Sequence, residues 1–328
     1  MMEVTITTNK MNHLVDPTLH IWGWEVPLYL FLGGITAGIL IIVSFILLKD
    51  KDGKSHIIAN RLALLAPVLL TLGMVALFMD LEHKLYVWRF YTAFRITSPM
   101  SWGSWILLLV YPISLLLILT TFREGFSKAY LWIDSYTQSK PKMQKYLWAY
   151  FRLFDFSEKY RSSIARIAIP VGILLGIYTG ILLSSFGARP FWNSSIIGPI
   201  FLVSGVSTAA ALVVLFSKDH EEIEFFTKID IWLITGEISL LILFIIGMLS
   251  SSEQHLKAIQ LILGGEMTTY FWVFFFGIGL LLPAFLEFME LKGREIPGSI
   301  AASLVLFGGI LLRFVIVEAG QISTWITY

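Results

Sequence analysis

The stretch from His20 to Gly38 reads H-I-W-G-W-E-V-P-L-Y-L-F-L-G-G-I-T-A-G, and it shows how the chain starts to fold. Polar and aromatic residues come first, and Pro27 follows at a place that suits the first turn of a helix, where a missing N–H costs nothing. Gly34 and Gly38 lie four residues apart, a spacing that lets a second helix approach closely in a membrane. The stretch therefore predicts a transmembrane helix below a polar, aromatic mouth. The alternative interpretation is an interfacial tryptophan belt above an ordinary packing motif.

The composition extends this prediction to the whole chain. Of its 328 residues, 56% are hydrophobic and 14% are charged, with a mean hydropathy of +0.76. A soluble domain carries about 25% charged residues. We therefore expect an all-α, polytopic integral membrane protein that forms a single membrane domain over residues 1–328. The expected spans, each able to cross about 30 Å of hydrocarbon, are residues 26–48, 57–80, 102–122, 164–186, 194–216, 229–250, 268–289 and 298–318.

The distribution of charge predicts how the chain is oriented. A net charge of +1 argues against nucleic acid as a partner. Most of the 24 Lys and Arg residues fall in the loops after the first, third, fifth and seventh spans, and such loops face the cytoplasm. We therefore expect a multi-pass protein of the inner (cytoplasmic) membrane with both termini outside. The long basic loop over residues 123–163 would lie inside, as an amphipathic segment on the anionic leaflet.

The redox-relevant residues limit which cofactors this protein can hold. It has no cysteine, so no iron–sulfur cluster with cysteine ligands can be bound on it. Its six histidines all fall in loops or at the ends of the expected helices, whereas a b-type haem needs histidines inside a bundle. We therefore expect no haem and no iron–sulfur cluster on this chain.

A second polar segment, D-L-E-H-K-L-Y-V-W-R-F-Y-T-A-F-R-I-T-S-P-M-S-W-G-S-W, runs from Asp80 to Trp105. It is too polar for lipid and rich in aromatic residues. Asp80, His83, Arg89 and Arg95 make it a candidate docking face for a partner subunit or a lid over a site. A water-exposed loop with incidental charge is the alternative.

Charged residues inside the expected spans form a second candidate group. Each costs about 2.5–3.5 kcal/mol on insertion scales and usually faces the bundle interior. Five of them are predicted to mark a proton path: Glu237, Glu287, Glu290, Arg313 and Glu318. The alternative is a set of interhelical ion pairs and hydrogen bonds that only hold the bundle together.

Several stretches together resemble the NrfD/PsrC family, the quinone-reactive membrane subunits of polysulfide-reductase-like respiratory complexes. They are G-W-E-V-P-L-Y-L-F-L-G-G-I-T-A-G, S-P-M-S-W-G-S-W, Y-T-G-I-L-L from Tyr178, W-N-S-S-I-I-G-P-I-F-L-V-S-G from Trp192, and G-G-I-L-L-R-F-V-I-V-E-A-G-Q from Gly308. The resemblance covers nearly the whole chain. It implies two four-helix bundles and a quinone site near the outer surface.

The resemblance also implies an iron–sulfur partner subunit on the outer face, often with a molybdopterin-bearing or other catalytic subunit beyond it. The family's pocket uses polar and aromatic residues at the start of the first span and a tyrosine on the fourth. Here those residues would be His20, Trp24, Glu25 and Tyr178. Tyr29 falls on the same helical face as Glu25, because residues four apart are neighbours on a helix.

Two classes of function therefore compete. The first is a subunit that binds menaquinone or ubiquinone and exchanges electrons with the iron–sulfur partner, with or without coupled proton movement. In this interpretation His20, Glu25 and Tyr178 handle the protons of the quinone. The second class is a proton-conducting channel or transporter with no redox role. A passive membrane anchor is a weaker third interpretation.

Overall fold

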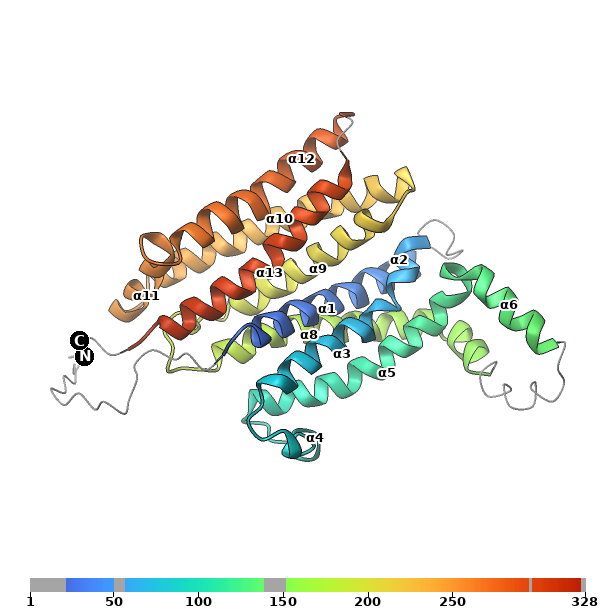
Figure 1. Ribbon diagram of the computed structural model, residues 1–328, viewed down its shortest axis with the longest axis horizontal. Coiled ribbons are helices and arrows are strands. Elements are labelled where there is room, and N and C mark those ends of the chain that lie inside the picture. Colours follow the sequence, from blue (N-terminus) through green and yellow to red (C-terminus); the bar gives the residue numbers. More distant parts are fainter. Residues whose placement is uncertain (1–21, 50–56, 139–151, 295–296, 326–328) are drawn as a thin grey trace.

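The computed structural model describes residues 22–49, 57–138, 152–294 and 297–325, and its regular structure there is helical (Figure 1). Seven helices in this part are long and apolar enough to cross a membrane, and a shorter apolar helix, α3 (Leu65–Asp80), joins them. The prediction of an all-α, polytopic membrane protein is therefore confirmed. The seven are α1 (Glu25–Lys49), α5 (Pro99–Gly125), α8 (Arg161–Ser184), α9 (Ile197–Phe216), α10 (His220–Leu249), η2 (Tyr270–Leu281) continued by α12 (Leu282–Leu291), and α13 (Gly298–Ile322).

The second expected span, 57–80, is not one continuous helix. It divides into α2 (Ile57–Leu62) and α3, with a tight turn at residues 63–64. The cause is Pro67, which has no N–H to offer the carbonyl of Ala63. That carbonyl instead accepts a bond from the Ala66 N–H, three residues on, at 3.3 Å.

The seventh expected span, 268–289, also departs from a regular α-helix. Its first part, η2, is π-helical, with the wider bonding of residue i to residue i+5. The Leu282 N–H still bonds back to the Gly277 carbonyl in this way, and Pro283 follows directly at the start of α12. Periodicity in the sequence predicts a helix here without distinguishing the two kinds.

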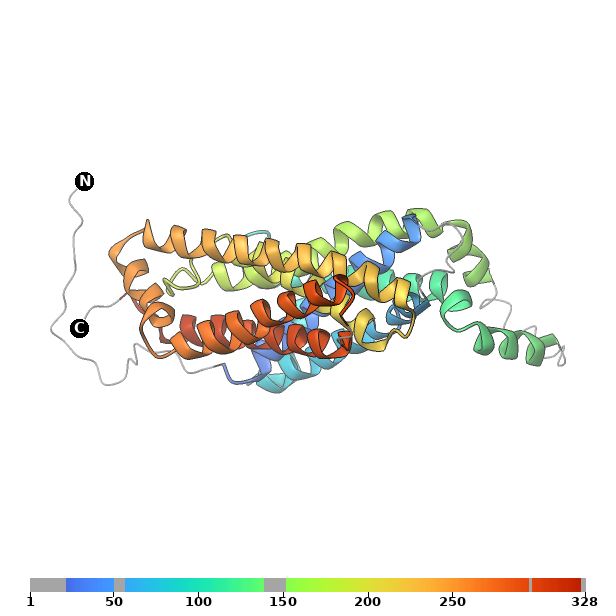
Figure 2. The same cartoon turned by 90° about the horizontal axis from the view of Figure 1, so that it is seen from above.

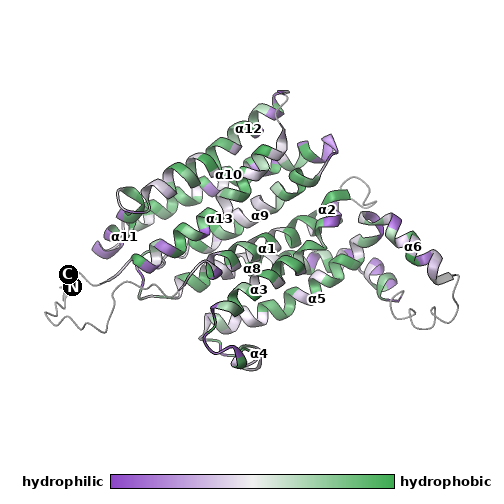
Figure 3. Cartoon of the chain, viewed as in Figure 1, coloured by the Kyte–Doolittle hydropathy of each residue, from purple (hydrophilic) through white to green (hydrophobic). Residues whose placement is uncertain are grey.

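The long helices form two groups of four that lie side by side (Figures 1 and 2). The first group holds α1, α3, α5 and α8, and the second holds α9, α10, α12 with η2, and α13. α1 is the central helix, because it packs against α3 and α8 of its own group and against α9 and α13 of the other. Hydropathy follows this plan, with apolar residues along the helices and hydrophilic ones gathered at their ends (Figure 3).

Small residues let the two groups meet closely at α1. A Cβ placed on Gly38 would lie 2.3 Å from the Gly205 carbonyl oxygen of α9 and 2.7 Å from the Ala209 Cβ. Neither distance is tolerable, so only glycine fits at this crossing. The close approach predicted from the spacing of Gly34 and Gly38 is thus confirmed, and α9 is the helix that approaches.

The molecule has two distinct ends. The start of α1 and the end of α13 lie at one end, with α4 (Arg89–Thr92) and α11 (Glu253–Leu263), and we name it the terminal end (Figure 1). The opposite end carries α2, α6 (Ser127–Gln138) and the turn between α9 and α10, and we name it the basic end. The sequence predicts that the terminal end faces outward, and this orientation stays a prediction.

The loop over residues 123–163 is largely helical where it is described. α6 projects from the basic end, and residues 152–159 form a further short helix before α8 (Figure 2). Leu131 and Trp132 of α6 are 63% and 66% exposed. The most basic part of the loop, from Lys140 to Tyr150, lies outside the described residues, and its contact with lipid stays a prediction.

Candidate functional site

The S-P-M-S-W-G-S-W stretch, residues 98–105, ties the polar loop after α3 onto the start of α5. The Ser101 hydroxyl donates to the Ala93 carbonyl at 3.0 Å and accepts from the Arg95 N–H at 3.0 Å. The Ser104 hydroxyl donates to the Phe90 carbonyl at 2.6 Å. These bonds satisfy backbone groups of a loop that has little regular structure of its own. The loop is therefore held in one place above the first helix group.

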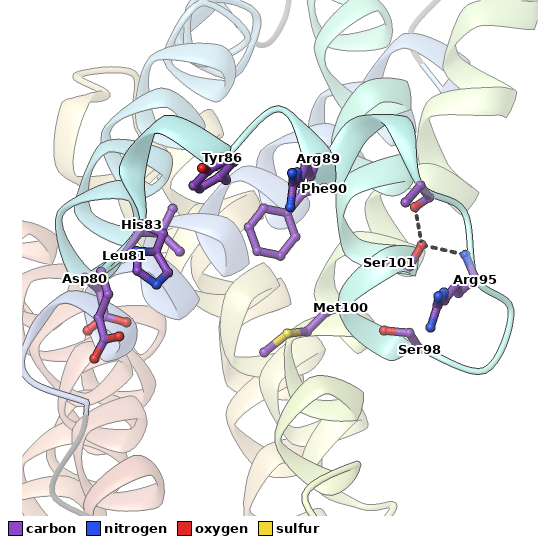
Figure 4. A pocket seen from close by; sticks show the side chains of 12 residues that line it. Asp80, Leu81, His83, Tyr86, Arg89, Phe90, Arg95, Ser98, Met100 and Ser101 are labelled. Atoms are coloured by element: carbon purple, nitrogen blue, oxygen red, sulfur yellow. Dashed lines mark hydrogen bonds between the residues drawn. The ribbon is translucent and has the colours of Figure 1, made fainter.

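The loop encloses a pocket of about 590 Å³ at the terminal end, which we name the terminal pocket (Figure 4). Asp80 and His83 lie on one side of it, and Arg95, Ser98 and Ser101 lie on the other (Figure 4). Its size lies in the range of small-molecule sites, and charged and polar side chains line it together with apolar ones. Its lining residues are Asp80, Leu81, Glu82, His83, Tyr86, Arg89, Phe90, Ala93, Arg95, Ser98, Met100 and Ser101.

Aromatic and cationic groups meet inside the terminal pocket. The Arg89 guanidinium lies 4.5 Å from the centre of the Tyr86 ring, and the His83 ring meets Tyr86 edge-on at 6.3 Å. The Asp80 carboxylate lies close enough to Glu25 of α1 for the two to interact electrostatically. N–H donors beside aromatic faces suit a planar ring that carries carbonyl oxygens. Among the described residues no group of three His, Asp or Glu side chains is placed to hold a metal ion.

A group of tyrosines lies within the first helix group. Tyr29 of α1 and Tyr178 of α8 are 3% and 5% exposed and interact with each other. Tyr91 of α4 and Tyr111 of α5 interact with Tyr29 as well, and the Tyr111 hydroxyl bonds Thr71 of α3 at 3.1 Å. Partial burial raises the pKa of the Tyr91 phenol above its ordinary value, and the nearby Tyr111 adds to the shift. The Tyr91 phenol therefore stays protonated at neutral pH, and the hydroxyl of every tyrosine in the group can donate a hydrogen bond.

The position of Tyr178 explains why a glycine, Gly103, follows Trp102 in the 98–105 motif. A Cβ at Gly103 would lie 1.9 Å from the Tyr178 hydroxyl oxygen, so any other residue would displace this phenol. The motif thus does two things at the start of α5. Its serines hold the loop, and its glycine leaves room for Tyr178.

Of the residues predicted for the quinone site, the structure brings one pair together and places a third beside the docking segment. Tyr29 and Tyr178 are neighbours, and Glu25 lies beside Asp80. Trp24 is 50% exposed at the start of α1, and His20 lies outside the described residues. The four predicted docking residues, Asp80, His83, Arg89 and Arg95, all line the terminal pocket.

Two members of the tyrosine group, Tyr91 and Tyr111, were not among the predicted residues. Tyr91 stands in an aromatic run and Tyr111 in an apolar span, and only the folding of the loop onto α5 brings the two tyrosines to Tyr29.

The E-A-G-Q stretch at the end of α13 closes the terminal end of the second helix group. The Gln321 side chain accepts from the Trp22 N–H and donates to the Trp22 carbonyl, both at 3.0 Å. Trp22 stacks on Trp192 at 5.2 Å, and a Cβ on Gly320 would lie 1.7 Å from the Trp192 ring nitrogen. Glu318, predicted for the proton path, contacts Gln321 at 3.3 Å in this same place.

The second helix group contains six buried polar side chains that we name the carboxyl cluster. Its members are Ser204, Ser207, Asp230, Glu237, Glu287 and Arg313, each at most 3% exposed.

Three members of this cluster, Glu237, Glu287 and Arg313, were predicted for the proton path. Asp230 was missed because it falls one residue inside the edge of its expected span, 229–250. Glu290 is partly exposed one turn beyond Glu287.

Arg313 and Glu237 meet at the Ser204 hydroxyl. Arg313 donates to Ser204 Oγ at 2.6 Å and to the carbonyls of Gly309 and Phe201 at 2.9 Å. Glu237 hydrogen bonds to Ser204 as well, and its charge interacts with Arg313. The guanidinium is therefore surrounded by oxygen atoms in the middle of an apolar bundle, as a buried cation requires.

The family model for polysulphide reductase, NrfD, matches residues 9–324 of this chain. The chain belongs to this family, which the resemblance of its motifs had indicated.

Individual relatives are also similar along most of their length. The chain is 28% identical to protein NrfD of Escherichia coli, over 92% of this chain and 96% of the relative. It is 28% identical to a chain of the polysulfide reductase of Wolinella succinogenes, over 92% and 94%. It is 23% identical to a subunit of the selenate reductase of Mesobacillus selenatarsenatis, over 92% and 74%.

Proposed function

We propose that this protein is the quinone-reactive membrane subunit of a respiratory reductase complex. The single observation that carries the proposal is the terminal pocket. It lies at the end of a transmembrane helix group, has Arg and His donors next to aromatic faces, and belongs to a chain with no cysteine. A quinone headgroup accepts hydrogen bonds at two carbonyls, and its reduction takes up two electrons and two protons. The pocket offers hydrogen-bond donors for the two carbonyls. The phenols of Tyr29 and Tyr178, which are proton donors, lie in the same helix group.

In this proposal electrons pass directly between the quinone and a partner subunit. Two relatives are named as single components of a polysulfide reductase and a selenate reductase, which supports an assembly of several subunits here as well. We place an iron–sulfur subunit on the terminal end, with a molybdopterin-bearing or other catalytic subunit beyond it. Large apolar side chains around the terminal pocket support docking there, since Leu85, Trp88, Phe94 and Ile96 are all more than half exposed.

The test begins with the purified complex and its co-purifying subunits. We expect iron–sulfur clusters in the preparation and quinol-linked reduction of an electron acceptor. Tyr178→Phe removes one buried hydroxyl without changing its shape, and turnover should fall about 100-fold if this phenol donates a proton. His20→Ala, at the mouth of α1, should abolish turnover while the complex still assembles.

Tyr270→Phe is the matched control, because Tyr270 is half exposed on η2 in the other helix group. It should leave turnover unchanged. A complex without redox cofactors, or full quinol-linked activity in both Tyr178→Phe and His20→Ala, would contradict the proposed site.

Proton movement is the second part of the proposal, and the carboxyl cluster supports it. Ionisable residues inside membrane helices are functional candidates by default, and proton relays are among their roles. Glu237→Gln keeps shape and hydrogen bonding but removes the titratable proton. In proteoliposomes with an internal pH dye, electron transfer should persist while proton uptake per electron falls.

The competing function is a proton-conducting channel without a redox role, and the same cluster is the observation that favours it. The two functions differ in one measurement. A channel would conduct protons in liposomes with no quinol present, whereas a coupled subunit would move them only during turnover. An unaltered proton-to-electron ratio in Glu237→Gln would remove this residue from either path.

A further inference from the structure

Asp230 of α10 and Glu287 of α12 form a buried pair of carboxyl groups in the second helix group. Asp230 is 0% exposed and Glu287 is 3% exposed, and the two carboxyl groups lie within hydrogen-bonding reach of each other. Ser207 of α9 donates to Asp230 Oδ1 at 2.5 Å. Three helices therefore converge on this pair.

The arrangement requires a proton between the two acids. An ionised carboxylate can only accept hydrogen bonds, so two ionised carboxylates cannot bond to each other. Asp230 Oδ2 and Glu287 Oε2 are both buried, and in the described part of the chain neither has an N–H or O–H donor. One proton held by the pair supplies the missing donor. It also removes the repulsion of two negative charges in contact at low dielectric.

The surrounding charges do not replace this proton. Among the described residues, Glu237 on α10 interacts electrostatically with Asp230 and Glu290 on α12 with Glu287, and both are acids themselves. α9 contributes only hydroxyls to this region, and Arg313 on α13 is bound to Ser204, one turn away from Ser207 along α9. None of the ion pairs formed among the described residues includes Asp230 or Glu287.

The pair lies between water and the interior of the cluster. Towards the basic end, Glu290 is partly exposed one turn beyond Glu287, and it interacts with the exposed His220 at the start of α10. Towards the interior, Ser204 lies one turn from Ser207 along α9, and Glu237 lies two turns from Asp230 along α10. Seven residues separate Asp230 from Glu237, about 10 Å along the helix.

We propose that Asp230 and Glu287 share a single proton and form a loading site, which takes that proton from the aqueous phase at the basic end through Glu290. This inference deepens the proton-movement part of the proposed function and rests on it for the direction of transfer. The shared proton itself rests only on the geometry of the pair. No bond between heavy atoms changes, since a proton enters from water at Glu290 and leaves towards Glu237.

Infrared spectroscopy of the purified complex, without quinone, tests the shared proton. The spectrum of the double variant Asp230→Asn with Glu287→Gln is subtracted from that of the unaltered complex at pH 7. We expect the difference to contain one protonated carboxyl carbonyl band, which shifts in D2O, together with one carboxylate. A difference without a carbonyl band, or with two such bands and no carboxylate, would overturn the shared proton.

The single variant Asp230→Asn provides a second measurement if the double variant does not assemble. The amide of Asn is itself a donor to Glu287 and accepts from Ser207, so it satisfies the pair without a shared proton. This variant should assemble normally and change the carbonyl band. Glu253→Gln, an exposed acid on α11 paired with Lys257, is the control and should leave the band unchanged.

The loading step has its own measurement in proteoliposomes. Glu290→Gln should slow proton uptake from the basic end several-fold while quinol-linked electron transfer with an artificial acceptor continues. Glu224→Gln, an exposed acid on α10 paired with Lys228, is the matched control. Unchanged uptake in Glu290→Gln would overturn the route. A complex with no quinol-linked turnover at all would instead contradict the proposed function, and the carbonyl band would still be readable.

Discussion

The terminal pocket and the carboxyl cluster hold similar residue types in opposite surroundings. The pocket collects Asp, His and Arg in a loop of short helical turns where water reaches them, and hydroxyls of α5 hold that loop from below. The cluster collects Asp, Glu and Arg at most 3% exposed between long helices. In the pocket a charged side chain is available to a ligand, because water can replace its partners. In the cluster every charge must be matched by protein atoms or by a proton.

The largest expected effect lies in the cluster. Arg313→Met would leave Ser204, two backbone carbonyls and the charge of Glu237 without their donor. Removing one partner of a buried charged pair costs about 3–5 kcal/mol. Denaturation of the chain in detergent micelles should show this loss. Arg313→Met combined with Glu237→Leu should recover much of it, and a double variant no more stable than Arg313→Met would contradict the coupling.

The next effect concerns how the tyrosines are positioned beside the pocket. Gly103→Val should displace the Tyr178 hydroxyl, whose oxygen lies 1.9 Å from the place a Cβ would take. A shift of about 1 Å in a reacting group can cost about 100-fold in rate. Gly247→Val is the control, since nothing lies within 4 Å of a Cβ there. Quinol-linked turnover should fall in the first variant and stay normal in the second.

A smaller effect is expected for partner binding at the terminal pocket. Arg89→Glu and Arg95→Glu reverse the charge of two lining residues, and recovery of the iron–sulfur subunit in a pull-down should fall about tenfold, which is about 1.4 kcal/mol. Lys257→Glu, on α11 at the same end, is the control. Full recovery with both Arg variants would show that the partner binds elsewhere.

The smallest effect is expected at the clamp on α1. Gln321→Ala removes two partly buried hydrogen bonds to the backbone of Trp22, and each is worth about 0.5 kcal/mol because water can replace it. Thermal unfolding of the purified complex should shift down slightly. Because the Trp22 ring remains stacked on Trp192, the mouth of α1 should keep its place and turnover should be nearly normal. A large loss of turnover would show that this clamp positions the pocket.

Much of the site was visible in the sequence because polar residues are conspicuous in an apolar chain. Asp80, His83, Arg89 and Arg95 stand close together in one polar segment, and all four line one pocket. Tyr178 was predicted from the family motifs and Tyr29 from its helical spacing to Glu25, and the packing of α1 against α8 brings the two together. Tyr91 and Tyr111 were not predicted, because one more tyrosine in an aromatic loop, or a single tyrosine in an apolar span, carries no signal of its own.

The sequence by itself determined the membrane class and the approximate spans, because the length and apolarity of a span are local properties. It also predicted the close approach of α1 to another helix, since the spacing of Gly34 and Gly38 is local too. Only the tertiary structure decided which buried charges meet. Asp230 and Glu287 lie far apart along the chain, and their contact depends on how α9, α10 and α12 pack together. Hydropathy reports whether a residue is buried, but the free energy of a buried acid depends on which atoms face it.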